Sequence, residues 1–252
     1  MRYFLWLAYD GRNYHGWQIQ PNGITVEEVV ERCLTTLLRQ PIDIVGAGRT
    51  DAGVNAAGMV AHFDVPVPLL RPDQLLHRLD RMLPHDIAAW RIEAVPPNAH
   101  ARFSALWREY HYDVTLRKEP LLRHYAYHVP FTLDFQRMNE AARVLMTYED
   151  FTSFAKVHTD VKTNICHVSE ARWQEIAPGH WRFTIRADRF LRNMVRAIVG
   201  TLFDVGRGKL SIDDMRTVIE RRNRQEAGES VPAAALTLYA VGYPTDIIPP
   251  LP

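Results

Sequence analysis

The sequence predicts an α+β fold built from two mixed α/β domains with largely antiparallel sheets. Helical and strand patterns alternate along all 252 residues, a length that suits two domains of ordinary size. Short turns such as Pro178-Gly179 join neighbouring strand patterns, which favours antiparallel pairing. Apolar residues make up 47% of the chain, enough for a core. We expect domains over 1–105 and 106–245, followed by a Pro-rich tail over 246–252.

The N-terminal half carries strand patterns that alternate with two helical ones. The pair Thr25 and Glu28 forms a capping-box pattern that opens the first helix, which should run to about Arg39. Pro72 is well placed at the start of the second helix, which should end near Pro84. The strands expected here are Tyr3–Tyr9, Pro41–Val45, Gly58–Val65 and Ile87–Val95.

The C-terminal half repeats this mixture without a clear internal sequence repeat. Asp134 is a predicted cap for a helix to about Met146, and Ser211 with Asp214 for one to about Asn223. A long amphipathic helix is expected over Asp188–Val205, stopped by Gly206. The strands expected here are Ala105–Leu116, Val168–Ile176, His180–Ala187 and Leu236–Tyr243.

The charge, the cysteine count and the lack of long apolar runs limit the kinds of protein that this chain could be. The formal net charge is only +1, yet 26 of the 30 basic residues are arginine, whose guanidinium matches phosphates and stacks on bases. Two cysteines, Cys33 and Cys166, predict neither a disulfide framework nor a cysteine-based zinc site. His124 and His128 lie in a strand-like segment, which disfavours a metal site there. Because no apolar run reaches membrane-spanning length, we expect a soluble, cytoplasmic protein.

The most informative segment is the glycine-rich run Gly46–Val54, which follows a short apolar strand pattern. Asp51 occupies the position where a dinucleotide-binding fingerprint needs its third glycine, and a carboxylate there would repel a pyrophosphate. No P-loop pattern follows either. Two interpretations remain: a turn with a surface ion pair between Arg49 and Asp51, or a turn that presents Asp51 for catalysis.

Longer motifs resemble those of the tRNA pseudouridine synthase A family over nearly the whole chain and in the same order. The string AGRTDAGV (47–54) is highly specific, and the others are jointly strong. These others are YDGRNYHGWQ (9–18), HARFSA (100–105), EDFTSF (149–154), FLRNMVRAIVGTL (190–202) and LYAVGYP (238–244). The resemblance implies two related α/β domains with a catalytic cleft between them. It also implies a tRNA uridine isomerase that acts at positions 38, 39 and 40 of the anticodon stem-loop, as a homodimer.

Pseudouridine formation requires one ionised carboxylate and a group that moves a proton, and no metal or organic cofactor. We assign Asp51 as the nucleophile, which Arg49 or Arg196 would keep ionised. Whether Asp51 attacks C6 of the uracil, attacks the ribose C1′ or assists elimination to a glycal stays open. By the resemblance, Arg196 pairs with the aspartate, and Tyr110 stacks on the target uracil and is a candidate for the proton transfer. The resemblance also implies that Arg49 fills the space that the flipped nucleotide leaves, or holds that nucleotide. Further expected RNA contacts are Arg102, Arg189 and Arg192.

Each of these assignments has a structural alternative. On the helix expected over Asp188–Val205, Arg189, Arg192 and Arg196 form a stripe that is equally typical of a solvated basic face. Gly200 lies one turn beyond Arg196 and leaves room for a close approach. Without the resemblance, Tyr110 and Tyr112 would be core aromatics on one face of a strand.

The chain departs from the family pattern at three positions. It has Asn55 where histidine is usual, Cys166 where arginine is common and Ala235 in place of a glycine. Asn55 is expected to alter hydrogen bonding near the site, and Cys166 to remove a phosphate contact. An alternative function is a non-catalytic RNA-binding module with an RRM-like sheet, for which replacing Asp51 would leave function intact. A small-molecule enzyme that binds a nucleotide at the glycine turn is a third, less favoured possibility.

Overall fold

The computed structural model describes residues 1–156 and 163–248 and divides into two compact units. The first unit is Met1–Trp107 together with the chain from Leu238 onward, and the second is Arg108–Thr237. Each unit contains helices and a mainly antiparallel sheet, which confirms the predicted α+β class. Of the predicted tail, 249–252 lies outside the described residues.

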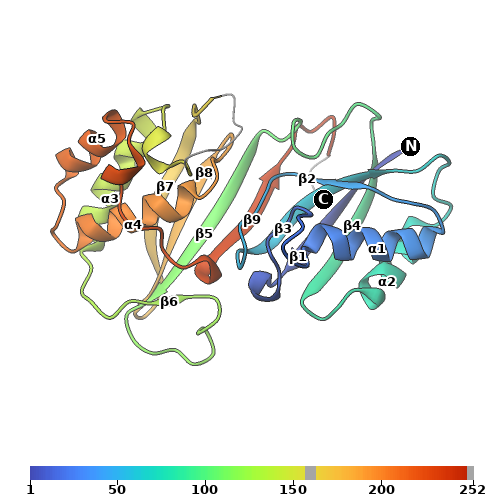
Figure 1. The fold of residues 1–252 in the computed structure, drawn as a ribbon, viewed down its shortest axis with the longest axis horizontal. Coiled ribbons are helices and arrows are strands. Elements are labelled where there is room, and N and C mark those ends of the chain that lie inside the picture. The colour runs from blue at the N-terminus through green and yellow to red at the C-terminus, as the bar shows by residue number, and fades with distance from the viewer. Residues whose placement is uncertain (157–162, 249–252) are drawn as a thin grey trace. The chain divides into compact units, whose positions relative to one another are not determined.

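The first unit is built on a sheet with the strand order β4-β1-β3-β9, with β2 paired to β3. β1 pairs antiparallel with both β3 and β4, so it occupies the middle of the sheet and is almost entirely buried. Two helices, α1 and α2, lie on one face of these strands (Figure 1). The elements are β1 (Arg2–Tyr9), η1 (Gly11–Asn13), α1 (Val26–Leu38), β2 (Ile44–Gly46), β3 (Asn55–Asp64), α2 (Pro72–Met82), β4 (Ile87–Val95) and β9 (Leu236–Gly242).

Local signals account for the helix boundaries of the first unit. The hydroxyl of Thr25 accepts a hydrogen bond from the Glu28 N–H at 3.4 Å, which satisfies one of the free donors at the start of α1. Arg39, with φ of 56°, ends that helix in the left-handed conformation. Pro72 occupies the first turn of α2, as predicted.

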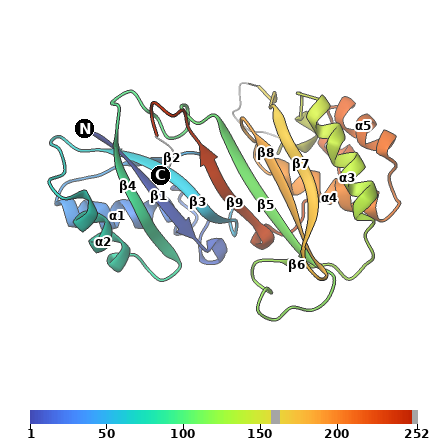
Figure 2. The same cartoon turned by 180° about the vertical axis from the view of Figure 1, so that it is seen from behind.

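The second unit has the strand order β5-β8-β7, and the two-residue strand β6 pairs parallel to β5. Figure 2 shows β7 and β8 from the side opposite to that in Figure 1. Phe203 of α4 contacts Trp173 of β7 at a ring distance of 6.0 Å, so α4 packs on the sheet. The elements are β5 (Trp107–Thr115), β6 (Tyr127–His128), α3 (Phe135–Val144), β7 (Val168–Ala177), β8 (His180–Ala187), α4 (Met194–Gly206) and α5 (Ile212–Glu220).

The long helix predicted over Asp188–Val205 is wrong at its start, because α4 begins only at Met194. Asn193 has a φ of 66°, which is incompatible with a continuous α-helix. The groups of Asp188 that would cap a helix are engaged elsewhere: its carboxylate accepts from the His167 N–H at 2.8 Å and its carbonyl from Arg108 at 2.8 Å. Arg189 and Arg192 therefore precede the helix and do not form a helical stripe with Arg196.

Candidate active site

The glycine-rich run forms a turn that connects β2 to β3 in the first unit. Val54 donates its N–H to the Asp51 carbonyl at 3.1 Å, and Gly53 adopts a φ of 78° within this turn. Asp51 is partly exposed, whereas the adjacent Thr50 and the nearby Val54 are buried. The backbone is thus anchored on both sides of a carboxylate that reaches the surface.

The segment Tyr9–Gln18 holds this turn from behind. The hydroxyls of Tyr9 and Thr50 form a hydrogen bond at 2.9 Å, and the Trp17 N–H donates to the Thr50 carbonyl at 3.3 Å. The Gly53 N–H donates to the Tyr14 carbonyl at 3.4 Å. Hydrogen bonds between residues more than 30 positions apart therefore join these two sequence motifs into one unit around Asp51.

Glycine is required where Tyr9–Gln18 and the turn meet. Gly16 has a φ of 87°, and a Cβ at this residue would stand 2.3 Å from the Thr50 carbonyl oxygen. A Cβ on Gly11 would likewise overlap the carbonyl of Val54. Asn55, 4% exposed, accepts the Gly11 N–H at 2.9 Å. The Asn55 amide therefore fixes the turn to the segment behind it.

Arg49 lies on the same turn and is exposed. Its charge acts on Glu27 of α1, which accepts hydrogen bonds from the Trp17 indole at 3.1 Å and the Ile19 N–H at 2.8 Å. Burial raises the pKa of Glu27 above its usual value, while these hydrogen bonds and the Arg49 charge oppose the rise. Arg49 and Asp51 thus share one ordered turn, as the sequence predicted.

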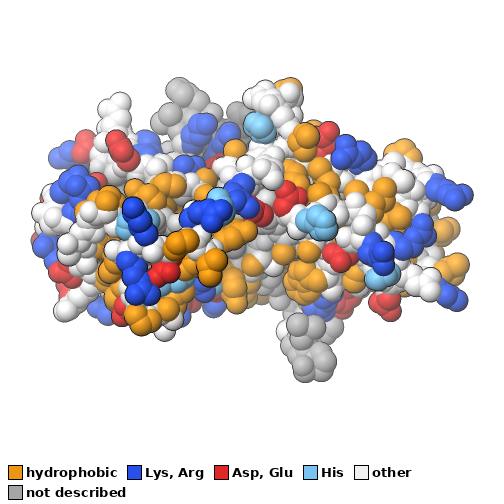
Figure 3. Space-filling model, turned by 90° about the horizontal axis from the view of Figure 1, so that it is seen from below, with side chains coloured by type: hydrophobic (Ala, Val, Ile, Leu, Met, Phe, Trp, Pro, Cys, Tyr) orange, Lys and Arg blue, Asp and Glu red, His pale blue; other side chains and the backbone are white. Residues whose placement is uncertain are grey.

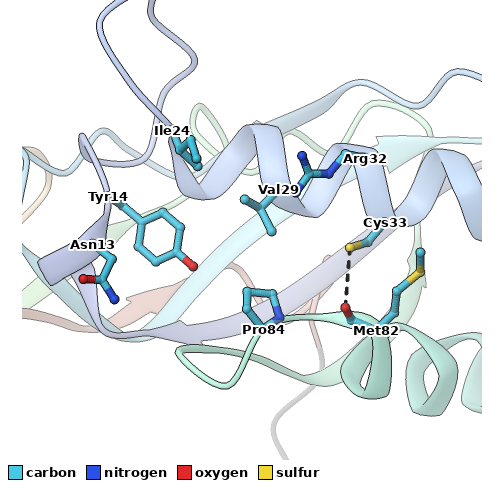
Figure 4. A pocket seen from close by; sticks show the side chains of 8 residues that line it. All are labelled: Asn13, Tyr14, Ile24, Val29, Arg32, Cys33, Met82 and Pro84. Atoms are coloured by element: carbon cyan, nitrogen blue, oxygen red, sulfur yellow. Dashed lines mark hydrogen bonds between the residues drawn. The ribbon is translucent and has the colours of Figure 1, made fainter.

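A groove of about 410 Å³ opens beside the same segment, between α1 and the end of α2 (Figure 4). Tyr14 donates to the Asp86 carboxylate at 2.6 Å and Asn13 at 3.0 Å, so η1 is fixed to the loop before β4. None of the predicted site residues lines the groove. Its lining residues are Asn13, Tyr14, Ile24, Val29, Arg32, Cys33, Met82 and Pro84.

In the second unit, Tyr110 lies on β5 and is 8% exposed. Its ring meets that of Phe190 edge-on, with centroids 5.1 Å apart at 87°. Tyr112, two residues on, is fully buried, and its hydroxyl has no hydrogen-bond partner among the described residues. Burial raises the pKa of Tyr112 above its usual value.

Arg196 lies in the first turn of α4 and is fixed by the segment that precedes β9. Its Nε donates to the Val231 carbonyl at 2.7 Å, and its own carbonyl accepts the Val231 N–H at 3.3 Å. A Cβ on Gly200 would overlap the Glu229 carbonyl, so the room that Gly200 leaves is filled by this same segment. Thr201 accepts the Gly228 N–H at 2.8 Å.

The segment 224–231, which no sequence motif singled out, shapes the surroundings of Arg196. Arg224 organises the segment by donating to the carbonyls of Ala227 at 3.2 Å and Gly228 at 3.1 Å, and to the Ser230 hydroxyl at 3.0 Å. Ser230 in turn accepts from the Asn193 amide at 2.6 Å. The sequence signal for this packing was two glycines, Gly200 and Gly228. One sequence does not show that their backbones lie against each other.

The other three arginines that were expected to contact RNA differ in exposure and in their contacts. Arg192 is exposed, and its carbonyl accepts the Lys156 N–H at 3.0 Å. Arg189 is partly exposed beside Asp188, whose carboxylate accepts its N–H at 2.7 Å. Arg102 is exposed on a loop of the first unit. Cys166 is fully buried, so the side chain at this position faces the interior rather than a phosphate.

On the face shown in Figure 3, basic side chains are interleaved with acidic and apolar ones. Within 1–156 and 163–248, no three histidine, cysteine or acidic side chains are grouped as metal ligands would be. Among the helices that the structure describes, none combines the length and apolar character needed to cross a bilayer.

Comparison with known proteins gives a consistent result. A family model described as tRNA pseudouridine synthase matches residues 6–104 and 141–244. The chain is 56% identical over 246 residues to a protein of Bacteroides fragilis named tRNA pseudouridine synthase A, covering 98% of both chains. It is 40% identical over 247 residues to a protein of Bacillus subtilis with the same name, covering 96% of this chain and 99% of that one.

Proposed function

Because this chain belongs to the tRNA pseudouridine synthase family, we propose that it isomerises uridines at positions 38, 39 and 40 of the anticodon stem-loop, with Asp51 as nucleophile. Family membership establishes the enzyme class, an isomerase that converts uridine to pseudouridine in tRNA. The target positions, the site residues and the assembly are the proposed part. The observation that carries the assignment of Asp51 is the doubly anchored turn that brings its carboxylate to the surface.

The reaction is an internal exchange of bonds. The bond from N1 of the uracil to the ribose C1′ breaks, a bond from C5 to the same carbon forms, C5 loses a proton and N1 gains one. Because product and substrate are isomers, no oxidant or cofactor is consumed. The protein must supply a fixed nucleophile, a route for the proton and a place for the base outside its helical stack.

We assign the remaining roles by residue type and setting. Arg49, exposed on the turn of Asp51, holds the flipped nucleotide or fills the space that it leaves. Tyr110, held edge-on by Phe190, stacks on the target uracil. Arg196, fixed through the Val231 carbonyl, keeps the carboxylate ionised. The proposal thus needs residues of both units to act on one uridine.

The three other basic residues are proposed to contact RNA phosphates. Arginine is suited to this because its planar guanidinium donates two parallel hydrogen bonds to a phosphate. Such contacts position the RNA but do not specify its sequence. The residues are Arg102, Arg189 and Arg192.

We further propose that the enzyme is a cytoplasmic homodimer that binds one tRNA across two copies. With a formal net charge of +1, a single chain carries little excess positive charge, and pairing two copies would combine their local arginines. Light scattering on the active protein tests this, and a monomer with full activity would contradict it.

The decisive experiment compares wild type with Asp51→Asn on an unmodified tRNA transcript in the presence of a chelator. We expect pseudouridine in the anticodon stem-loop with the wild type and at least a 10³-fold loss with the variant, because the carboxylate is the nucleophile. RNA affinity should stay within about threefold, since the amide is isosteric. Asp43→Asn, at an exposed aspartate before β2, is the matched control and should retain activity. Equal activity of Asp51→Asn and wild type would refute the assignment.

A further inference from the structure

The loop at 99–104 of the first unit is unusually well fixed for a surface loop. Ala101 donates its N–H to His62 Nδ1 at 3.2 Å, and its carbonyl accepts from the Tyr243 hydroxyl at 2.6 Å. The guanidinium of Arg2 donates to the Ala99 carbonyl at 2.8 Å. The loop is therefore tied to β1, to β3 and to the chain after β9.

His100 fixes the loop from within. Its ring Nδ1 accepts hydrogen bonds from the backbone N–H groups of Arg102 at 3.1 Å and Phe103 at 3.3 Å. The backbone N–H of His100 donates to the Ser104 hydroxyl at 2.9 Å. The Ser104 N–H returns a hydrogen bond to the His100 carbonyl at 2.9 Å. Desolvation and the neighbouring Arg2 and Arg102 charges lower the pKa of His100, which favours the neutral ring that these bonds need.

This fixed loop presents Phe103 to solvent with 76% of its surface exposed. The ring lies 4.4 Å from that of His100, which packs at 4.6 Å against the buried His62. The Arg102 guanidinium stands 5.5 Å from the Phe103 ring centre. An isolated exposed phenylalanine is ordinary, but here a supporting stack of rings, a fixed backbone and an adjacent cation occur together.

We propose that Phe103, with Arg102 beside it, is a stacking platform for an unpaired base of the tRNA. An aromatic face with a nearby arginine is the combination that proteins use to hold single-stranded RNA bases. The choice of RNA as the occupant rests on the proposed function. A protein partner would fit an apolar patch, but the cation on the exposed ring favours a polyanion.

The loop that carries Phe103 and the end of the Asp51 turn are bonded to β3 at different points. The Asp51 turn leads into β3 at Asn55, whereas the loop at 99–104 is bonded to His62, seven residues further along the same strand. At 3.3 Å per residue, these two points are about 23 Å apart. We expect the base held at Phe103 to be a second contact on the same RNA, one that governs binding rather than the chemical step.

The test measures tRNA affinity and steady-state kinetics for three substitutions at one position. We expect Phe103→Ala and Phe103→Leu to weaken tRNA binding about tenfold and raise KM similarly, with kcat within twofold of wild type. Phe103→Tyr, which keeps an aromatic face, should bind like wild type. Leu70→Ala removes an exposed apolar side chain, 98% exposed in the same unit, and should change nothing. Thermal unfolding of each variant checks that the fold is kept.

Each alternative result has a distinct meaning. Phe103→Ala with affinity within twofold of wild type, or Phe103→Leu with wild-type affinity, would overturn the platform. A change in oligomeric state without a change in RNA affinity would also overturn it, in favour of a protein contact. If the wild type forms no pseudouridine in tRNA, the proposed function fails instead, and the binding data still report on the platform. Ultraviolet crosslinking gives a direct readout, since the peptide containing Phe103 should carry a nucleotide.

Discussion

Replacing Gly16 by alanine should misplace the Asp51 turn and slow the reaction. The new Cβ would stand 2.3 Å from the Thr50 carbonyl oxygen, whereas ordinary contact begins near 3.4 Å. The carbonyl, one residue before Asp51, must therefore move by about 1 Å. A displacement of about this size in an active site costs on the order of 100-fold in rate, or about 2.7 kcal/mol of activation free energy.

Gly179→Ala is the matched control, because it separates backbone strain from the clash. Gly179 has a φ of 73°, close to the 87° of Gly16, but the nearest atom to its new Cβ would be Leu116 Cβ at 4.0 Å. Both alanines pay roughly 1–2 kcal/mol for the left-handed backbone. Only Gly16→Ala should also lose about 100-fold in kcat.

The assay follows tritium released from tRNA that carries [5-³H]uridine, because C5 loses its hydrogen when it bonds to the ribose. Urea unfolding of both variants measures the strain that they share. A Gly16→Ala enzyme whose kcat lies within threefold of that of Gly179→Ala would refute the inference that Tyr9–Gln18 holds the catalytic turn in register.

Two further predictions concern stability. Burial and the charges of Arg2 and His100 lower the pKa of His62 from 6.5 to about 4, although Asp64 opposes this. The unfolded chain then binds more protons below pH 6.5, so stability should fall by about 3 kcal/mol as the pH drops from 6.5 to 4. Urea unfolding at several pH values measures the fall, which His62→Gln should reduce; an equal fall in this variant would contradict the assignment. Gly200→Ala should cost roughly 1–3 kcal/mol, because its Cβ overlaps the Glu229 carbonyl, and calorimetry should show a lower Tm. Gly48→Ala, with no atom within 4 Å of its new Cβ, is the control, and equal Tm values would contradict the clash.

Features encoded by adjacent residues were predictable. The capping box of Ser211 and Asp214 is present with both of its hydrogen bonds, and Asp134 caps α3 through the Arg137 N–H at 3.0 Å. The strand predicted over Ile87–Val95 has these same bounds. For the two caps, the stabilising partner lies within a few residues, so its effect does not depend on the rest of the fold. The strand is recognisable from its own residue pattern, although its hydrogen-bond partner is the distant β1.

The start of α4 was mispredicted for the opposite reason. The residues after Asp188 have an amphipathic pattern, and Asp188 is a good helix cap by type. Its polar groups instead bond to His167 and Arg108, the latter 80 residues away in sequence. Competition from such distant partners cannot be read from local spacing.

The residues alone were enough to identify the family, the mixed α/β class and Asp51 as the candidate nucleophile, because the motifs are specific and their residue types carry the chemistry. The contacts that hold the turn of Asp51 appear only in the folded chain: the hydroxyl of Tyr9, the glycine at 16 and the amide of Asn55. The tertiary structure alone also placed Phe103 on a fixed loop. These arrangements depend on hydrogen bonds between segments about 30 to 140 residues apart, which form only when the sheet brings those segments together.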